Sequence, residues 1–255
     1  MAGAIISGAI DAGRLSPGEI CVYDISEEKT AAYAKRGLRV CQSPAKLAGL
    51  CKYVVLAIKP QNFEEVLSQL AGAVSDETVL ISIAAGISPS YIKSKLGEGS
   101  KVVQVMPNTP LLIGFGATAI SKAEPTTQEE FDFACGLFAS AGVVEQIDNR
   151  LMNEVIPLNG SSPAFIYQLT KLFVDRAQQL GFERECANRL FCNTLIGAAQ
   201  MMLTTGMDHQ ALIDMVTSPA GTTFSGLQAL AENGFDEAII KAYDATVRRA
   251  YELGR

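Results

Sequence analysis

The segment Lys52-Tyr-Val-Val-Leu-Ala-Ile58, which leads directly into Lys59 and Pro60, decides the fold class of this 255-residue chain. Its almost unbroken apolar run predicts a strand that is buried on both faces. Residues 60–70 then have the pattern of a helix, so a helix follows the strand at once. The same apolar strand pattern returns at Thr78–Ile83 and Lys101–Val105. This alternation predicts a parallel sheet that is covered by helices on both sides.

Upstream of this segment, Ile20–Asp24 is a further strand candidate, and Ser26–Gly37 is a helix candidate with Ser26 as its N-cap. Residues 1–13 also have helical texture. After about Arg150 the strand pattern ends, and the helix candidates are residues 162–181, 184–205 and 236–253. We therefore expect a dinucleotide-binding α/β domain over residues 1–150 and an all-helical domain over residues 151–255.

Composition excludes several classes of protein. Apolar residues make up 48% of the chain and charged residues 19%, which is typical of a folded globular protein. The net charge of −6 gives no basic face for nucleic acid. No apolar run reaches the roughly 20 residues that a membrane span needs, and the N-terminus lacks the basic region of a signal peptide. We therefore expect a cytoplasmic protein that binds neither nucleic acid nor membrane.

The cysteines and the histidine give no metal site. None of the six cysteines forms a C-x-x-C pair, which predicts reduced and buried thiols in a cytosolic protein. His209, the one histidine, lies in Gly206-Met-Asp-His209, which has the pattern of a turn between helices. We therefore expect no metal ion.

The beginning of the α/β domain departs from the usual pattern. A dinucleotide-binding domain of this type starts with a strand and a G-x-G-x-x-G/A loop before its first helix. Here the sequence starts within helical texture at Met1. We expect that about ten upstream residues, with the first strand and the glycine loop, are missing. The alternative is a fold that begins with the helix and has a rearranged sheet.

Six short motifs follow one another at fitting separations. They are Met1-Ala2, Ala57-Ile-Lys-Pro60, Ala84-Ala-Gly-Ile87, Met106-Pro-Asn-Thr-Pro110, Gly160-Ser-Ser-Pro-Ala-Phe165 and Ser218-Pro-Ala-Gly-Thr-Thr223. Together they resemble the pyrroline-5-carboxylate reductase family over the whole chain. The resemblance implies a Rossmann-like parallel sheet domain followed by an all-helical dimerisation domain. It also implies reduction of 1-pyrroline-5-carboxylate, a small imino acid, to L-proline with NADPH or NADH, by homodimers that in some members assemble into decamers.

Several of these motifs end strands, where small residues let backbone amides approach a dinucleotide. The alternative is that they are only tight turns between strand and helix. Asp24 ends a strand, and a carboxylate there can bind a ribose diol and repel a 2′-phosphate, which favours NADH, although the family commonly uses NADPH. Its alternative role is to cap the next helix. The cofactor-binding candidates are Met1, Ala2, Asp24, Ala57, Ile58, Lys59, Pro60, Ala84, Ala85, Gly86 and Asn108.

The substrate-binding candidates lie at the starts of helices, where free amides suit a carboxylate. They are Gly160, Ser161, Ser218, Gly221, Thr222 and Thr223. Without the resemblance, ordinary helix caps would be the favoured explanation of the last four. Ile156 stands where the family has a threonine that is a candidate proton donor. The resemblance therefore leaves protonation to water or to a neighbour such as Asn159, which is the one candidate catalytic residue.

Two other functions remain open from the sequence. One is a divergent, non-catalytic relative that acts as a dimeric binding protein. The other is a related dehydrogenase of hydroxy acids, which would need a catalytic lysine such as Lys171 on the interdomain helix. In each case the helical part carries more apolar residues than one small domain covers, which predicts a homodimer. These residues are Phe165, Tyr167, Leu169, Leu172, Phe173, Leu190, Phe191, Leu195, Met201 and Met202.

Overall fold

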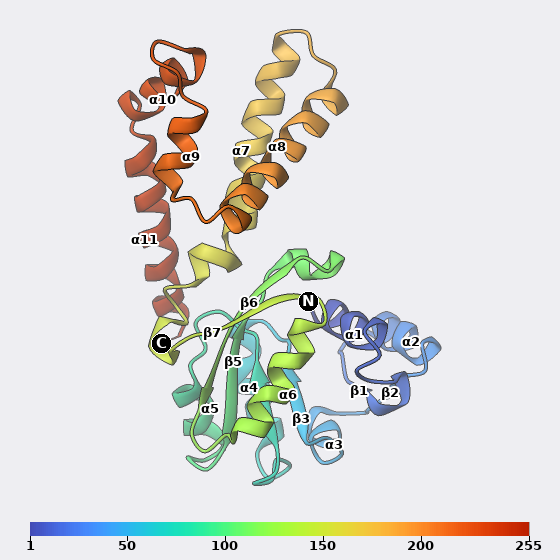
Figure 1. Ribbon diagram of the computed structural model, residues 1–255. Coiled ribbons are helices and arrows are strands. Elements are labelled where there is room, and N and C mark those ends of the chain that lie inside the picture. The colour runs from blue at the N-terminus through green and yellow to red at the C-terminus, as the bar shows by residue number, and fades with distance from the viewer. Residues whose placement is uncertain (255) are drawn as a thin grey trace. The chain divides into compact units, whose positions relative to one another are not determined.

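The computed structural model describes residues 1–254 and is shown as a ribbon in Figure 1. The chain forms two compact units. Unit 1 comprises Met1–Pro163 and the segment from Ala245 onward, and unit 2 comprises Ala164–Asp244. The expected boundary at residue 150 falls after the last strand, whereas the contacts assign residues 151–163 and the end of the last helix to unit 1. The reason is that Ala250 packs into an apolar cluster there and is buried.

A five-stranded sheet forms the centre of unit 1, with the strand order β3-β4-β5-β6-β7. The first three strands are parallel, and Tyr53 is in register with Val79, which is in register with Lys101. These three strands confirm the strands that the apolar runs predict, and their ends differ from the predicted ends by at most two residues. The bounds are β3 Tyr53–Leu56, β4 Val79–Ser82, β5 Lys101–Met106, β6 Gly116–Ala123 and β7 Gly142–Gln146.

The last two strands were not expected. β6 runs antiparallel to β5, with Val105 opposite Ile120, and β7 runs parallel to β6. The sheet is therefore mixed rather than purely parallel. Most residues of β6 are glycine, alanine, threonine and serine, so no apolar run marks this strand in the sequence.

Helices cover both faces of this sheet, as the sequence predicts. One face packs against α1 (Ala2–Asp11) and α6 (Gln128–Ala139). The other packs against α3 (Pro44–Ala48), α4 (Phe63–Leu70) and α5 (Pro89–Leu96). Neighbouring strand residues serve opposite faces: Ile81 belongs to the first cluster and Leu80 to the second, and both are almost completely buried. This is the alternation that a strand with two covered faces requires.

A separate two-stranded parallel sheet joins β1 (Cys21–Val22) to β2 (Arg39–Val40). Helix α2 (Glu27–Lys35) connects them, and the Ser26 hydroxyl accepts a hydrogen bond from the Lys29 N–H at 3.4 Å, so the expected N-cap is confirmed. The short helical turns of the unit are η1 Pro17–Glu19, η2 Pro60–Asn62, η3 Thr109–Ile113, η4 Asn149–Leu151 and η5 Ile156–Gly160.

Five helices make up the C-terminal part of the chain. Phe173 of α7 stacks on Phe191 of α8, with ring centroids 4.4 Å apart. His209, which was expected in a turn, is the first residue of α9 and follows the capping residue Asp208. Across residues 1–254, every helix is too short or too polar to cross a bilayer. The bounds are α7 Ser162–Gln179, α8 Arg184–Thr204, α9 His209–Met215, α10 Thr222–Glu232 and α11 Phe235–Leu253.

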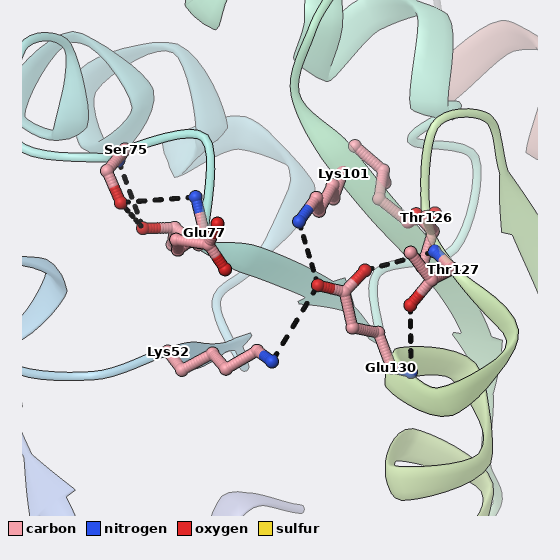
Figure 2. A network of polar contacts seen from close by, with 9 residues as sticks. Lys52, Ser75, Glu77, Lys101, Thr126, Thr127 and Glu130 are labelled. Carbon is pink, nitrogen blue, oxygen red and sulfur yellow. Dashed lines mark hydrogen bonds and ion pairs between the residues drawn. The ribbon is translucent and has the colours of Figure 1, made fainter.

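A buried carboxylate joins α6 to the amino ends of the strands (Figure 2). Glu130 has a side chain that is only 4% exposed, and its Oε1 lies 2.8 Å from the ammonium of Lys101 and 3.9 Å from that of Lys52. Its Oε2 accepts a hydrogen bond from the Thr127 N–H at 3.0 Å. Burial alone would raise the pKa of Glu130, but the hydrogen bonds from Lys101 and Thr127 outweigh it and lower this pKa. The carboxylate form therefore stabilises the folded state above about pH 4.5, and this stability is lost as the pH falls through the lowered pKa.

We expect Lys101→Met to lower the free energy of unfolding by about 3 kcal/mol at pH 7, because it leaves a buried carboxylate without its close cation. Lys52→Met is the matched control, since its ammonium is more distant and its side chain is 46% exposed. It should cost less than about 1 kcal/mol. Urea unfolding measures both, and the gap between the two variants should narrow as the pH falls through the lowered pKa of Glu130. Equal losses for the two variants would contradict this assignment.

Candidate active site

Segments that follow three neighbouring strands surround a pocket of about 320 Å³ at the carboxyl edge of the parallel strands. Ala57–Pro60 follow β3, Ile83–Ala85 follow β4 and Pro107 follows β5. Met1, which caps the start of α1, completes the lining. Seven of the cofactor-binding candidates therefore lie around one pocket. Of the residues that line this pocket, only Ile83 and Pro107 were not among the cofactor-binding candidates, although each directly follows a strand.

The pocket offers amides and one cation to a ligand. The first amide that α1 uses internally is that of Ala4, which donates to the Met1 carbonyl, so the N–H groups of Ala2 and Gly3 have no partner within the helix. Such a helix start favours an anion, above all a phosphate. The exposed ammonium of Lys59 pairs with no carboxylate of residues 1–254. These groups fit a dinucleotide that carries a pyrophosphate.

Gly86 continues the turn after β4 and has a positive φ of 80°. A side chain at this position would be strained by the backbone conformation, and its Cβ would also lie 2.6 Å from the carbonyl oxygen of Ala250. Gly86 therefore adjoins the pocket-lining residue Ala85 and lies against the end of α11.

Asp24 lies after β1 and is not among the residues that line the pocket. Its Oδ1 accepts a hydrogen bond from the Ser26 N–H at 2.9 Å, and its Oδ2 lies 3.4 Å from the Lys29 ammonium. The carboxylate thus orders the turn into α2, which is the role that the sequence left open as the alternative. Since the side chain is still 30% exposed, the contact with a ribose stays a prediction.

Two asparagines hold the start of β6. Asn108 accepts a hydrogen bond from the Ala117 N–H at 3.0 Å, and Asn159 donates from its Nδ2 to the Ala117 carbonyl at 2.9 Å. The same Nδ2 donates to the Met106 carbonyl at 2.7 Å. Asn159 is buried, and its Oδ1 has no hydrogen-bond partner among the described residues. Its amide N–H groups are thus engaged by the backbone, which fits a positioning role, and catalysis by Asn159 stays a prediction.

Gly160 and Ser161 follow Asn159 at the start of α7. A Cβ on Gly160 would lie 3.2 Å from the Met106 sulfur, so the backbone passes close to the end of β5. The Ser161 N–H donates to the carbonyl of Ile156 at 2.8 Å. Ile156 itself is buried in an apolar cluster with Met106, which suits its aliphatic side chain.

The other substrate-binding candidates belong to unit 2 and lie in the turn before α10 and in the first turn of this helix. Gly221 is the N-cap of α10, and a Cβ there would lie 2.4 Å from the Ser218 hydroxyl oxygen. Ala220 has a positive φ of 57°, a backbone conformation that glycine adopts more readily than alanine. Thr222 and Thr223 are exposed, and their N–H groups begin the helix. The turn therefore presents free amides and a hydroxyl.

All six cysteines are free, as expected. Only Cys41 is buried, and the other five are half-buried. Within residues 1–254, no group of histidine, cysteine, aspartate and glutamate side chains is arranged to hold a metal ion.

Comparison with known proteins finds similarity over the whole chain. Residues 149–253 match the family model "Pyrroline-5-carboxylate reductase dimerisation", and residues 1–86 match "NADP oxidoreductase coenzyme F420-dependent". The chain is 38% identical to the pyrroline-5-carboxylate reductase of Methanosarcina acetivorans, over 100% of this chain and 95% of the relative. It is 32% identical to that of Escherichia coli, over the same shares.

A solved structure is also similar over nearly the whole chain. The pyrroline carboxylate reductase of Plasmodium falciparum with NADP bound superposes with a TM-score of 0.92 at 26% identity. The match covers 99% of this chain and 94% of that chain.

Proposed function

The chain belongs to the pyrroline-5-carboxylate reductase family, and we propose that it reduces 1-pyrroline-5-carboxylate to L-proline with NADPH or NADH. One observation carries the proposal beyond family membership. Met1, Ala57–Pro60 and Ala84–Ala85, which are distant in sequence, line one pocket at the carboxyl edge of the parallel strands. Open α/β sheets bind dinucleotides at this edge.

The cofactor is held by unit 1 in this proposal. When bound, the reduced nicotinamide supplies the hydride that reduces the imine carbon. The ammonium of the lining residue Lys59 and the amides of Ala2 and Gly3, which directly follow the lining residue Met1, bind the pyrophosphate, because these donors have no partner of their own. The small side chains of Ala57 and Ala84 let the dinucleotide approach the backbone. Asn108 and Asn159 keep the end of β5 and the start of β6 in place through Ala117.

The substrate carboxylate is bound by the turn before α10. The N–H groups of Thr222 and Thr223 and the Thr223 hydroxyl supply the donors, and Gly221 and Ser218 keep the turn tight. The Ser161 N–H is not among these donors, because it donates to the Ile156 carbonyl. The imine is reduced most readily when it is protonated, since an iminium accepts hydride far better than a neutral imine. The protein therefore acts mainly by orientation and electrostatics.

The active form is a homodimer in the cytoplasm. The dimerisation model covers residues 149–253, and the helices of unit 2 expose many large apolar side chains. Six free thiols are in keeping with a reducing compartment.

Asp24 decides the choice between the two cofactors. We expect Asp24→Ser to raise kcat/KM for NADPH about tenfold, because it removes a negative charge that opposes the 2′-phosphate. The serine hydroxyl can still accept the Ser26 N–H, so the turn into α2 should persist. Asp11→Ser, an exposed position at the end of α1, is the matched control for net charge. Steady-state kinetics with both cofactors measure the effect. An unchanged ratio of kcat/KM for NADPH to kcat/KM for NADH would show that Asp24 only orders the turn into α2.

The reaction class is tested by cofactor oxidation with different substrates. With 1-pyrroline-5-carboxylate, NADPH or NADH should be consumed at a rate that saturates with substrate. Oxidation of hydroxy acids with NADP or NAD should be absent. The opposite result would support a hydroxy-acid dehydrogenase, and proline binding without turnover would support the non-catalytic alternative.

A further inference from the structure

The last turn of α11 is held against the rest of unit 1 by one polar contact and one apolar contact. The Tyr251 hydroxyl donates a hydrogen bond to the Glu154 carboxylate at 2.5 Å, and this bond raises the pKa of Tyr251. Ala250, one residue earlier, is 3% exposed and packs with Met106 and Met152. The end of the chain is thus held beside the end of β5.

The same turn of α11 lies directly against the turn that follows β4. A Cβ on Gly86 would come within 2.6 Å of the Ala250 carbonyl, 3.1 Å of the Leu253 Cβ and 3.3 Å of the Gly254 nitrogen. From the other side, a Cβ on Gly254 would lie 2.1 Å from the Gly86 carbonyl. Two glycines therefore let the two backbones touch, and no side chain separates them.

The turn after β4 also forms a wall of the pocket. Ala84 and Ala85 line the pocket, while the next residue, Gly86, touches the end of α11. Ala85 also packs against the apolar cluster that contains Ala250. The three atoms nearest to a Cβ built at Gly86 all belong to residues 250–254, so the end of α11 supports this wall of the pocket on that side.

We propose that the last turn of α11, residues 250–254, positions the dinucleotide pocket by supporting the Ala84–Gly86 turn, with Tyr251 as the positioning residue. The proposal rests on the proposed function, in that it takes the ligand of this pocket to be NADPH or NADH. It assigns a role in cofactor binding to the C-terminal end of the chain, which lies outside the cofactor-binding motifs of the sequence.

Two variants test this contact from outside the pocket. Tyr251→Phe removes the hydroxyl that fastens the helix end, and Gly254→Ala introduces a methyl group against the Gly86 carbonyl. Gly99→Ala is the matched control, because Gly99 also has no positive φ and has nothing within 4 Å of a built Cβ. Dissociation constants for NADPH come from fluorescence titration of the purified protein. Amide hydrogen exchange is followed at residues 84–86 and 250–253.

In both variants we expect the Kd for NADPH to rise about three- to tenfold, because the turn that forms one wall of the pocket loses part of its support while every direct contact to the cofactor remains. Amide exchange should quicken at residues 250–253 and at residues 84–86 together, while Gly99→Ala changes neither. KM for 1-pyrroline-5-carboxylate should stay within about twofold, which a general loss of structure would not allow.

Faster exchange in the helix end with an unchanged Kd would overturn the proposal, and so would exchange that quickens at residues 250–253 but not at residues 84–86. If the unmodified protein bound neither NADPH nor NADH, the proposed function would fail instead. The exchange at residues 84–86 would still decide whether the helix end supports this turn.

Discussion

Replacing Ile196 by glutamate is expected to abolish the oligomer. Ile196 lies on α8 and is 67% exposed, and Leu190 and Leu203 on the same helix are 60% and 81% exposed. A soluble monomer tolerates a contiguous apolar patch of roughly 300–600 Å², so a helix with such side chains is expected to be covered by a second copy of the chain. A charge placed in that interface is desolvated without a partner, which should shift the protein to monomers or to insoluble aggregates.

Leu50→Glu is the matched control for this experiment. Leu50 is also a large exposed side chain, at 52%, but it lies in unit 1 outside the region that matches the dimerisation model. Sedimentation velocity at micromolar concentration should give an oligomer for the unmodified protein and for Leu50→Glu. A well-folded monomer from the unmodified chain would contradict the assignment of unit 2 as the dimerisation region.

Removal of the Thr223 hydroxyl is expected to raise KM for 1-pyrroline-5-carboxylate about tenfold or more. Thr223 stands in the first turn of α10, where its hydroxyl adds to the free amides of the turn. A hydrogen bond to a charged group contributes about 1.5–3 kcal/mol, which corresponds to a factor of roughly ten to a hundred. The Kd for NADPH should stay unchanged, because the contact is to the substrate.

Thr204→Ala provides the control for the change of side chain. Thr204 is an exposed threonine at the end of α8 whose hydroxyl donates only to the Gln200 carbonyl of its own helix. Steady-state kinetics of both variants, together with fluorescence titration of NADPH, separate substrate binding from cofactor binding. An unchanged KM in Thr223→Ala would remove the turn before α10 from the substrate site.

The part of the fold that the sequence predicts is the part whose pattern is local. The apolar runs around Val54, Leu80 and Val103 mark β3, β4 and β5, because a strand buried on both faces must be apolar throughout. β6 consists mainly of small residues, so its sequence lacks the apolar run that identifies a buried strand. Its antiparallel pairing with β5 depends on tertiary structure and leaves no local pattern. The antiparallel strand was therefore missed.

The same reasoning explains which part of the site was predicted. Parallel strands bring their carboxyl ends to one edge, so Ala57–Pro60 and Ala84–Ala85 could be assigned to one pocket before their distances were known. The bond between Asn159 and the Ala117 carbonyl joins residues 42 positions apart, and nothing in the local sequence specifies it. The contact of Gly86 with the end of α11 likewise depends on tertiary packing alone.

The most direct test of the function is transfer of deuterium from labelled cofactor to product. The purified protein is incubated with 1-pyrroline-5-carboxylate and with NADPH or NADH that carries deuterium at the transferring position of the nicotinamide. We expect L-proline to form in a one-to-one ratio with oxidised cofactor. The proline should carry one deuterium at its δ-carbon, which is the former imine carbon. A folded, oligomeric protein that forms no deuterated proline with either cofactor would contradict it.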